Sequence, residues 1–122
     1  MARRRRLSRS GEFDRVYRDG SSQATRYLVL YSFPRREEDG GDIRLGVSAS
    51  RKVGGAVDRN RVKRVMKEAF WSLAERLPEG HDFVLVARPE IAELIEREGA
   101  EGVRASIEEA LAAFSGSEGR ST

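Results

Sequence analysis

The sequence predicts one small α/β domain. The chain has 122 residues, enough for a single core of sheet and helices. Residues 24–33 and 43–50 show the alternation of side chains that is expected of strands. Apolar residues then recur at helical spacing over residues 58–77, and a further apolar run follows at residues 82–88. Strand, helix and strand in this order form one α/β unit, so we expect the helix to pack on a sheet.

The N-terminal region is expected to contain a basic arm and a short helix. Residues 1–8 include four consecutive arginines and no apolar run of the kind found in targeting segments, so we interpret them as a flexible basic arm. Ser10 is a candidate N-cap for a helix that Gly20 would end. Phe13 and Tyr17 lie one turn apart on this helix and mark one face of it.

The two faces of the second strand differ in the size of their side chains. The face that suits the core carries Ile43, Leu45, Val47 and Ala49. The opposite face carries small residues, and these would leave a groove: Gly46, Ser48 and Ser50. Residues 34–41, which join the first two strands, are charged and end in two glycines, a composition typical of an exposed hairpin connection.

The central helix has one apolar stripe and is followed by shorter elements. Asp58 is its candidate N-cap, and the helix should end near Leu77, before a proline. Its apolar stripe consists of Val62, Val65, Met66, Ala69, Phe70, Leu73 and Leu77. Two further helices are expected at residues 90–96 and 100–114. We expect residues 9–114 to form the single domain and residues 115–122 a disordered tail.

Charge is distributed unevenly along the chain. Residues 1–70 carry 18 basic and 9 acidic side chains, whereas residues 71–122 carry 5 basic and 11 acidic ones. Seven of the basic residues fall within residues 51–67, together with a single acid, Asp58. Ordinary pairing of charges along a helix cannot neutralise such a segment. The basic half of the chain is therefore the predicted binding half, and RNA phosphates are its predicted ligand.

The candidate phosphate-binding residues share one side of the central helix. At about 100° per residue they fall on an arc beside the apolar stripe, with Arg61 further round. They are Arg59, Asn60, Arg61, Lys63, Arg64 and Lys67. The free N–H groups of the first turn would add to their attraction for a phosphate. The alternative interpretation is a charged face that is simply solvated.

Three aromatic residues suggest a second surface. Phe13 and Tyr17 of the first helix, with Tyr31 on the neighbouring strand, would line the groove of small residues. Single-stranded RNA binds such surfaces by stacking its bases on aromatic rings. The alternative, packing of an amphipathic helix on a sheet, predicts the same three residues, and the pattern alone leaves both open.

The sequence offers no catalytic set of its own. Cysteine is absent, and the single histidine, His81, stands in a turn, where we interpret it as a bystander. Clustered carboxylates or histidines, which a metal-dependent nuclease would need, are not apparent, so we predict no catalytic residue, metal site or bound cofactor. No stretch approaches the roughly 20 apolar residues that span a bilayer, so we expect a cytoplasmic protein without a membrane partner.

The basic segment carries a resemblance to a known family. Residues 57–64 read Val-Asp-Arg-Asn-Arg-Val-Lys-Arg and follow Gly-Val-Ser-Ala-Ser-Arg-Lys at residues 46–52. Together they resemble the signature of the bacterial ribonuclease P protein subunit, an Arg-Asn-Arg motif that opens a basic helix. The likeness extends over most of residues 6–88. It departs from the family at Tyr17, where Phe is frequent, and at Asp58, an acid in a variable position.

The resemblance implies a fold and a function. The fold would be a two-layer α/β (α+β) sandwich, a ribosomal protein S5 domain 2-like fold: a mixed sheet of about four strands packed with about three helices, with a left-handed βαβ crossover. The chain would be the protein subunit of an endoribonuclease whose RNA subunit carries the catalytic Mg²⁺. Its partners would be that catalytic RNA and the 5′ leader of precursor tRNA, and DNA is not expected. The leader-binding positions would be Phe13, Tyr17, Tyr31, Ser48, Arg51 and Lys52.

A second functional class remains open at this point. A non-enzymatic RNA-binding or ribosome-associated protein of similar fold would use the same basic helix. It would bind structured RNA without preferring a 5′ extension.

Overall fold

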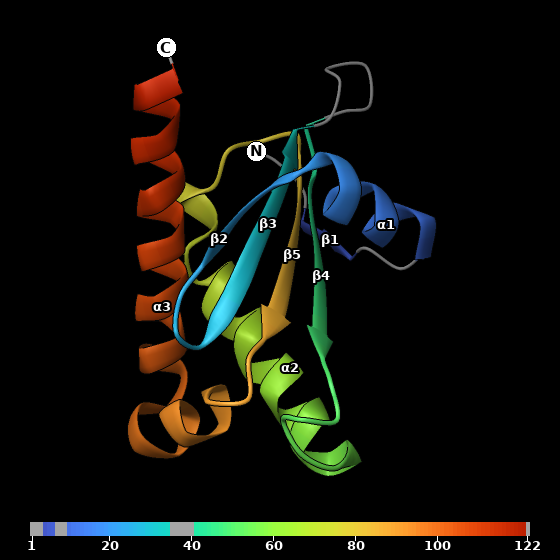
Figure 1. Cartoon of the computed structure of the whole chain (residues 1–122), viewed down its shortest axis with the longest axis vertical. Helices are drawn as coiled ribbons and strands as arrows, with labels where there is room; N and C mark the ends of the chain where they lie inside the picture. The colour runs from blue at the N-terminus through green and yellow to red at the C-terminus, as the bar shows by residue number, and fades with distance from the viewer. Residues whose placement is uncertain (1–3, 7–9, 35–40, 122) are drawn as a thin grey trace.

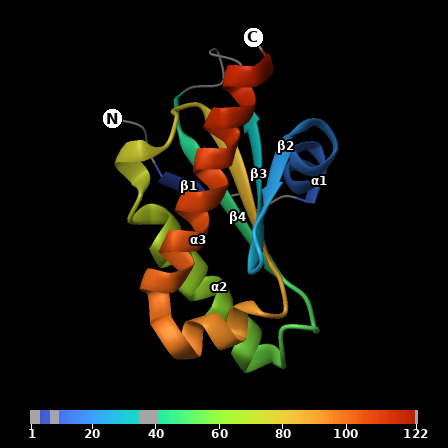
Figure 2. The ribbon, with the colours of Figure 1, turned by 60° about the vertical axis from the view of Figure 1, so that its left-hand side comes forward.

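The computed structural model describes residues 4–6, 10–34 and 41–121, and it shows a mixed sheet with helices on both faces (Figure 1). Helices α2 and α3 lie together on one face, and α1 covers part of the other (Figure 2). This confirms the predicted sandwich of about four strands and three helices, to which a three-residue strand is added at one edge. The elements are β1 (Arg4–Arg6), α1 (Ser10–Asp19), β2 (Ser21–Ala24), β3 (Leu28–Pro34), β4 (Ile43–Ala49), α2 (Ala56–Trp71), the 3₁₀ turn η2 (Ala74–Arg76), β5 (His81–Ala87) and α3 (Ile91–Ser121).

The strand order is β1-β4-β5-β3-β2, so the predicted hairpin between β3 and β4 is wrong. Strand β5 lies between them, parallel to β4 and antiparallel to β3. The reason is burial, because β5 carries apolar side chains toward both faces and its Phe83, Val84 and Leu85 are at most 1% exposed. Such a strand is stable only at the centre of a sheet that is covered on both sides.

The strand expected at residues 24–33 begins only at Leu28, as β3, and a turn at residues 25–27 separates it from β2, which was not expected. Thr25 causes the division: its backbone N–H donates to the carbonyl of Leu28 at 2.8 Å, and its hydroxyl accepts from the N–H of Leu28 at 3.2 Å. The same hydroxyl lies 2.6 Å from that of Ser106 on α3. Side-chain bonds of this kind compete with the strand ladder, so β2 folds back antiparallel to β3.

The main core lies between the sheet and helices α2 and α3. From α2 it receives the predicted stripe, in which Val62, Met66 and Phe70 are at most 3% exposed. From the sheet and α3 it receives Leu28, Leu30, Leu45, Phe83, Leu85, Val103 and Ile107. A smaller cluster on the opposite face joins α1 to the sheet through buried Val16 and Val84.

Helix α2 begins earlier than expected, so Asp58 is not its N-cap. Gly55 occupies the N-cap position without a side-chain hydrogen bond, and Asp58 lies in the first turn. A carboxylate in the first turn is still favourable, because it faces the positive end of the helix dipole. The helix also ends earlier, at Trp71, and η2 then carries the chain to Leu77, which remains buried.

The last two predicted helices form one element with a break. Gly99 has φ 65° and ψ −152°, which interrupts the helical path of α3 between the two predicted segments. The structure continues α3 to Ser121, where a disordered tail was expected, and forms β1 within the predicted arm; the remaining arm positions, 1–3 and 7–9, lie outside the described residues. None of the described helices is long and apolar enough to cross a membrane.

Candidate RNA interface

Helix α2 presents a row of cations that have no acidic partner within the described part of the chain. Arg59, Lys63 and Lys67 follow one another at four-residue spacing, and Arg64 lies beside them, exposed to solvent. Among the described side chains, none of the seven basic residues from Arg51 to Lys67 forms a salt bridge. The uncharged amide of Asn60 is exposed beside them. Arginines elsewhere differ, because Arg76, Arg97 and Arg104 all pair with glutamates of α3. The cationic row is therefore available to an anionic ligand.

Arg59 is the cation of α2 with a buried donor atom that lacks a partner among the described residues. Its side chain is partly buried beside the apolar stripe, and its Nε is buried without a hydrogen-bond partner among the described residues. A buried donor left unpaired costs about 1–3 kcal/mol, a loss that a phosphate oxygen would relieve.

Arg61 lies on the other side of α2. It lines a cleft of about 140 Å³ together with Val53 of the preceding loop, and with Ile95 and Glu96 of α3. The structure thus separates Arg61 from the row of Arg59, Lys63 and Lys67, in agreement with its expected place further round the helix. The two arginines of the Arg-Asn-Arg motif flank α2 rather than share one surface.

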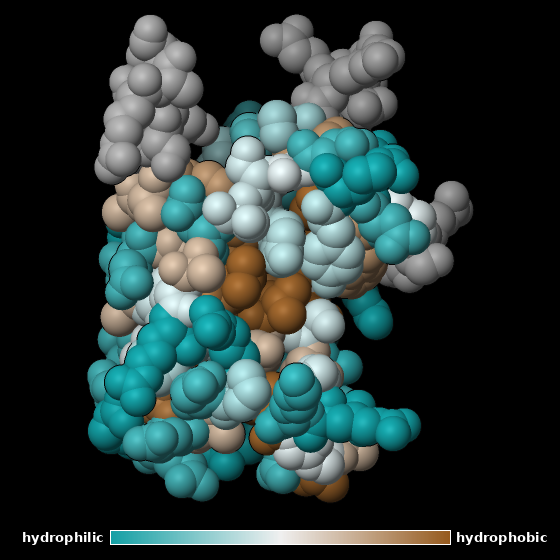
Figure 3. Space-filling model, in the orientation of Figure 1, coloured by the Kyte–Doolittle hydropathy of each residue, from teal (hydrophilic) through white to brown (hydrophobic). Residues whose placement is uncertain are grey.

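On the face of the sheet that α1 partly covers, side chains form three rows that run across β4, β5 and β3. Cross-strand pairing defines them. The first row contains Arg44, Asp82 and Phe33; the second contains Gly46, Val84 and Tyr31; the third contains Ser48, Val86 and Val29. Helix α1 covers the second row, and the third row is left half-buried beside it. Figure 3 shows apolar surface at the middle of this face, next to the polar surface of α1.

The predicted aromatic residues do meet at the border of this open row. The rings of Phe13 and Tyr17 are 6.3 Å apart, and Tyr17 meets Tyr31 edge-on at 4.9 Å. Tyr17 is 39% exposed, so its ring is available for stacking. Burial and the neighbouring Tyr31 raise the pKa of Tyr17, against a smaller opposing effect of its hydrogen bond with Ser48. The phenol therefore stays neutral and able to donate at physiological pH.

Gly46 does not form part of an open groove, which corrects the expectation from the sequence. The ring of Phe13 lies over it so closely that a Cβ at this position would be 2.4 Å from Phe13 Cζ. The small residue admits an aromatic ring instead of leaving space. Of the three small residues, Ser48 remains half-buried in the open row and Ser50 is exposed beyond the end of β4.

The open row includes two residues that were not predicted as site residues, Val29 and Val86. They are directly paired across β3 and β5 and are half-buried. The alternation of these strands contained the signal, since Val29 shares its face with Tyr31. Without the strand order, this face could not be distinguished from the core face.

The cationic and aromatic surfaces meet at the edge of β4. Strand β1 pairs with β4 only as far as Leu45. Just beyond, a cleft of about 120 Å³ brings Arg6 of β1 and Lys63 and Lys67 of α2 together with the ring of Phe13. Arg51 and Lys52, both exposed, follow β4 in the turn that leads to α2. One continuous strip of surface thus connects the open row with the cationic helix.

Comparison with known proteins identifies the family of the chain. The sequence profile of the family described as Ribonuclease P matches residues 1–112. The chain belongs to the ribonuclease P family. Ribonuclease P protein components of Bacillus cereus (strain B4264) and Bacillus pumilus (strain SAFR-032) are each 37% identical to it over 94 residues, which is 77% of this chain and 80% and 77% of theirs.

Solved structures of ribonuclease P proteins share the fold. The protein from Staphylococcus aureus, solved at 2.0 Å, superimposes with a TM-score of 0.75 at 29% identity, over 89% of this chain and 94% of that one. The protein from Thermotoga maritima superimposes with a TM-score of 0.73, also at 29% identity, over 84% of this chain and 90% of that one.

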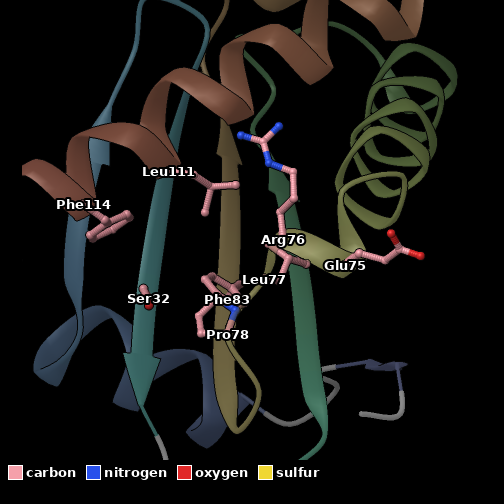
Figure 4. A pocket seen from close by; sticks show the side chains of 8 residues that line it. All are labelled: Ser32, Glu75, Arg76, Leu77, Pro78, Phe83, Leu111 and Phe114. Carbon is pink, nitrogen blue, oxygen red and sulfur yellow. The ribbon is translucent and has the colours of Figure 1, made fainter. Parts of the chain in front are cut away.

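Other features of this ribonuclease P fold lie away from the two surfaces. His81 donates through Nδ1–H to the carbonyl of Glu79 at 2.9 Å and stacks on Phe83, which agrees with a structural role. A cavity of about 330 Å³ lies on the α3 side of the sheet, lined by Ser32, Leu111 and Phe114 among others (Figure 4). In the described part of the chain, no three His, Cys, Asp or Glu side chains gather closely enough to hold a metal ion.

Proposed function

We propose that this chain acts as the protein subunit of ribonuclease P, binding the catalytic RNA and the 5′ leader of precursor tRNA. The holoenzyme would hydrolyse one phosphodiester bond, releasing the leader and leaving a 5′ phosphate on the tRNA. The observation that carries the proposal is the cleft at the edge of β4, where Arg6, Lys63 and Lys67 lie together with the ring of Phe13. Family membership supports the same assignment.

We assign binding of the catalytic RNA to α2. Its residues for this role are Arg59, Asn60, Arg61, Lys63, Arg64 and Lys67. Because Arg59 and Arg61 flank the helix, the RNA would contact α2 from both sides, with Arg61 reaching it near α3. Several phosphate contacts of this kind make binding steeply dependent on salt.

We assign binding of the leader to the open row and to the residues that border it. Phe13, Tyr17 and Tyr31 offer ring faces and edges to bases, and Ser48 offers a hydroxyl beside them. Arg51 and Lys52 stand at the end of β4, where they would hold the leader phosphates. An extended single strand suits this surface because stacking tolerates any base sequence.

The proposal places the chemistry in the RNA subunit, with its Mg²⁺, and the protein in the cytoplasm. Accordingly, it assigns no catalytic or metal-binding residue to this chain. The protein contributes positive charge, which lowers repulsion between the two RNA molecules, and an oriented groove for the leader. A change in rate at limiting Mg²⁺ is the expected consequence.

The test is cleavage of a 5′-extended precursor tRNA by a bacterial ribonuclease P RNA at low Mg²⁺, with and without the protein. We expect the protein to restore the rate and the Arg59→Ala/Arg61→Ala variant to fail. Arg97→Ala/Arg104→Ala removes the same charge from α3 and serves as the matched control, which should remain active. RNA binding without any rate increase by the intact protein would overturn the proposal in favour of a non-enzymatic RNA-binding protein.

A further inference from the structure

The first row of the sheet face contains a fully buried carboxylate held by two arginines. Asp82 is 0% exposed. Its Oδ1 accepts from Arg44 Nε at 2.7 Å, and its Oδ2 accepts from Arg44 Nη2 at 2.7 Å and from Arg15 Nη2 at 3.1 Å. Arg44 is its direct neighbour across β4 and β5, whereas Arg15 comes from α1. The group links the helix to two strands of the sheet.

Arg15 connects this ion group to the helix that carries Phe13 and Tyr17. It lies on α1 between Phe13 and Tyr17, and its guanidinium stacks over the ring of Phe33 with Cζ 5.0 Å from the centroid. Among the described side chains of α1, Arg15 is the one that forms an ion pair with the sheet. Helix α1 is therefore fixed by charge at the first row, while Tyr17 borders the open third row.

The apolar contacts of α1 are too few to define its position alone. Val16 is the one side chain of the described part of α1 that is fully buried, and it packs on Val84. Phe13 and Tyr17 stay partly exposed. The ring of Phe13 over Gly46 and the edge-on contact of Tyr17 with Tyr31 are further apolar contacts of α1 with this face, and neither contact is directional. The bond from Arg15 Nη2 to Asp82 Oδ2 at 3.1 Å adds a directional contact, and its carboxylate end is fully buried, so displacing Arg15 would remove a hydrogen bond from a buried charge.

We propose that Asp82 and Arg44 are positioning residues for leader binding. They act through Arg15 to hold α1 where Phe13 and Tyr17 border the open row. This inference rests on the proposed leader-binding function. Asp82 touches no substrate in this scheme. Arg44 orients the carboxylate by its two-point contact, and the carboxylate then orients the helix.

The test uses Arg15→Met, because methionine keeps much of the packing over Phe33 and removes the charge. Two readouts are made. In the reconstituted holoenzyme, the KM for 5′-extended precursor tRNA is compared with the affinity for leaderless tRNA. In the free protein, nuclear Overhauser contacts between the rings of Tyr17 and Tyr31 report the position of α1. Arg76→Met is the matched control, because it removes a half-exposed arginine from its salt bridge with Glu108 on the far side of the molecule.

We expect Arg15→Met to reduce the preference for the leader at least about fivefold, the smallest value for loss of one stacked base. The ring contacts should weaken in parallel, and kcat at saturating substrate should stay within about twofold, since the chemical step is untouched. Arg15→Lys, which keeps the charge, should recover part of both. Arg76→Met should change neither.

Three results would overturn the inference. The first is an intact Tyr17–Tyr31 contact in folded Arg15→Met, which would show that α1 needs no anchor, whatever the leader does. The second is an unchanged leader preference despite displaced rings. The third is an equal loss in Arg76→Met. If the wild-type holoenzyme itself shows no leader preference, the proposed function fails separately, and the ring contacts still decide the positioning role. Asp82→Asn, where it folds, should reproduce Arg15→Met.

Discussion

Replacing Gly46 by alanine tests whether the Phe13 ring is part of the leader surface. The added Cβ would lie 2.4 Å from Cζ and 2.6 Å from Cε1 of Phe13, closer than carbon atoms can approach. The backbone itself tolerates alanine, because Gly46 is not among the glycines with positive φ. The ring of Phe13 must therefore move, and it is half-buried at the edge of a cleft into which it can turn.

The magnitudes separate the effect on stability from the effect on binding. Replacing glycine by alanine at a compatible position stabilises by about 0.4–1 kcal/mol, through the unfolded chain. Overpacking costs about 1–3 kcal/mol if the ring stays, and little if it turns outward. We therefore expect the free energy of unfolding to fall by no more than about 2 kcal/mol. Displacement of one stacking ring is worth about 1–3 kcal/mol in leader binding, or about 5- to 150-fold in affinity.

The assay is the affinity of the holoenzyme for 5′-extended and leaderless tRNA, with unfolding in urea measured on the same proteins. Combining Gly46→Ala with Phe13→Ala completes a double-mutant cycle. If glycine acts only by admitting the ring, the double variant should bind the leader as weakly as Phe13→Ala alone. Full leader affinity in folded Gly46→Ala, or strictly additive losses, would refute the reasoning.

Three further outcomes are expected. Lys63→Ala/Arg64→Ala should make the log–log salt dependence of RNA binding shallower by about 1.4–1.8, two phosphate contacts at 0.7–0.9 each, and an unchanged slope would remove these residues from the interface. Because the pKa of Tyr17 is raised above 10.0 by burial, its contribution to the free energy of unfolding is complete below pH 10 and is lost as the pH rises above it. Tyr17→Phe should lessen that alkaline loss, as followed by urea unfolding against pH. The Ser32 side chain lines the cavity of about 330 Å³ beside α3, so Ser32→Val should stabilise the fold by about 0.5–2 kcal/mol without changing leader affinity. Lower stability of this variant would show that the cavity cannot accept the valine side chain.

Local patterns in the sequence were sufficient for several conclusions. The stripe of Val62, Met66 and Phe70 predicted the buried side of α2, because helical periodicity is a property of neighbours in the chain. The excess of basic residues beside that stripe predicted a cationic face, and these residues form no salt bridge with any other described side chain. The place of Arg61 away from Lys63 and Lys67 also follows from the angle per residue.

Other parts of the interface required knowledge of which strands are neighbours. Strand β5 lies between β3 and β4, although it follows both in the chain, and only this order places Val29 beside Val86 and Tyr31 in the groove. The N-cap assigned to Asp58 is also wrong, because α2 begins at Ala56 with Gly55 as its N-cap.

The sequence by itself determined the class of the fold, the buried side of α2 and the cationic character of its exposed side. The tertiary structure alone decided that Phe13 fills the space above Gly46, that Arg6 joins Lys63 and Lys67 at the edge of β4, and that Asp82 receives Arg15 from α1. Each of these contacts joins residues far apart in the chain. Periodicity carries no information about such pairs, because their meeting depends on sheet order and register, which the folding of the whole core selects.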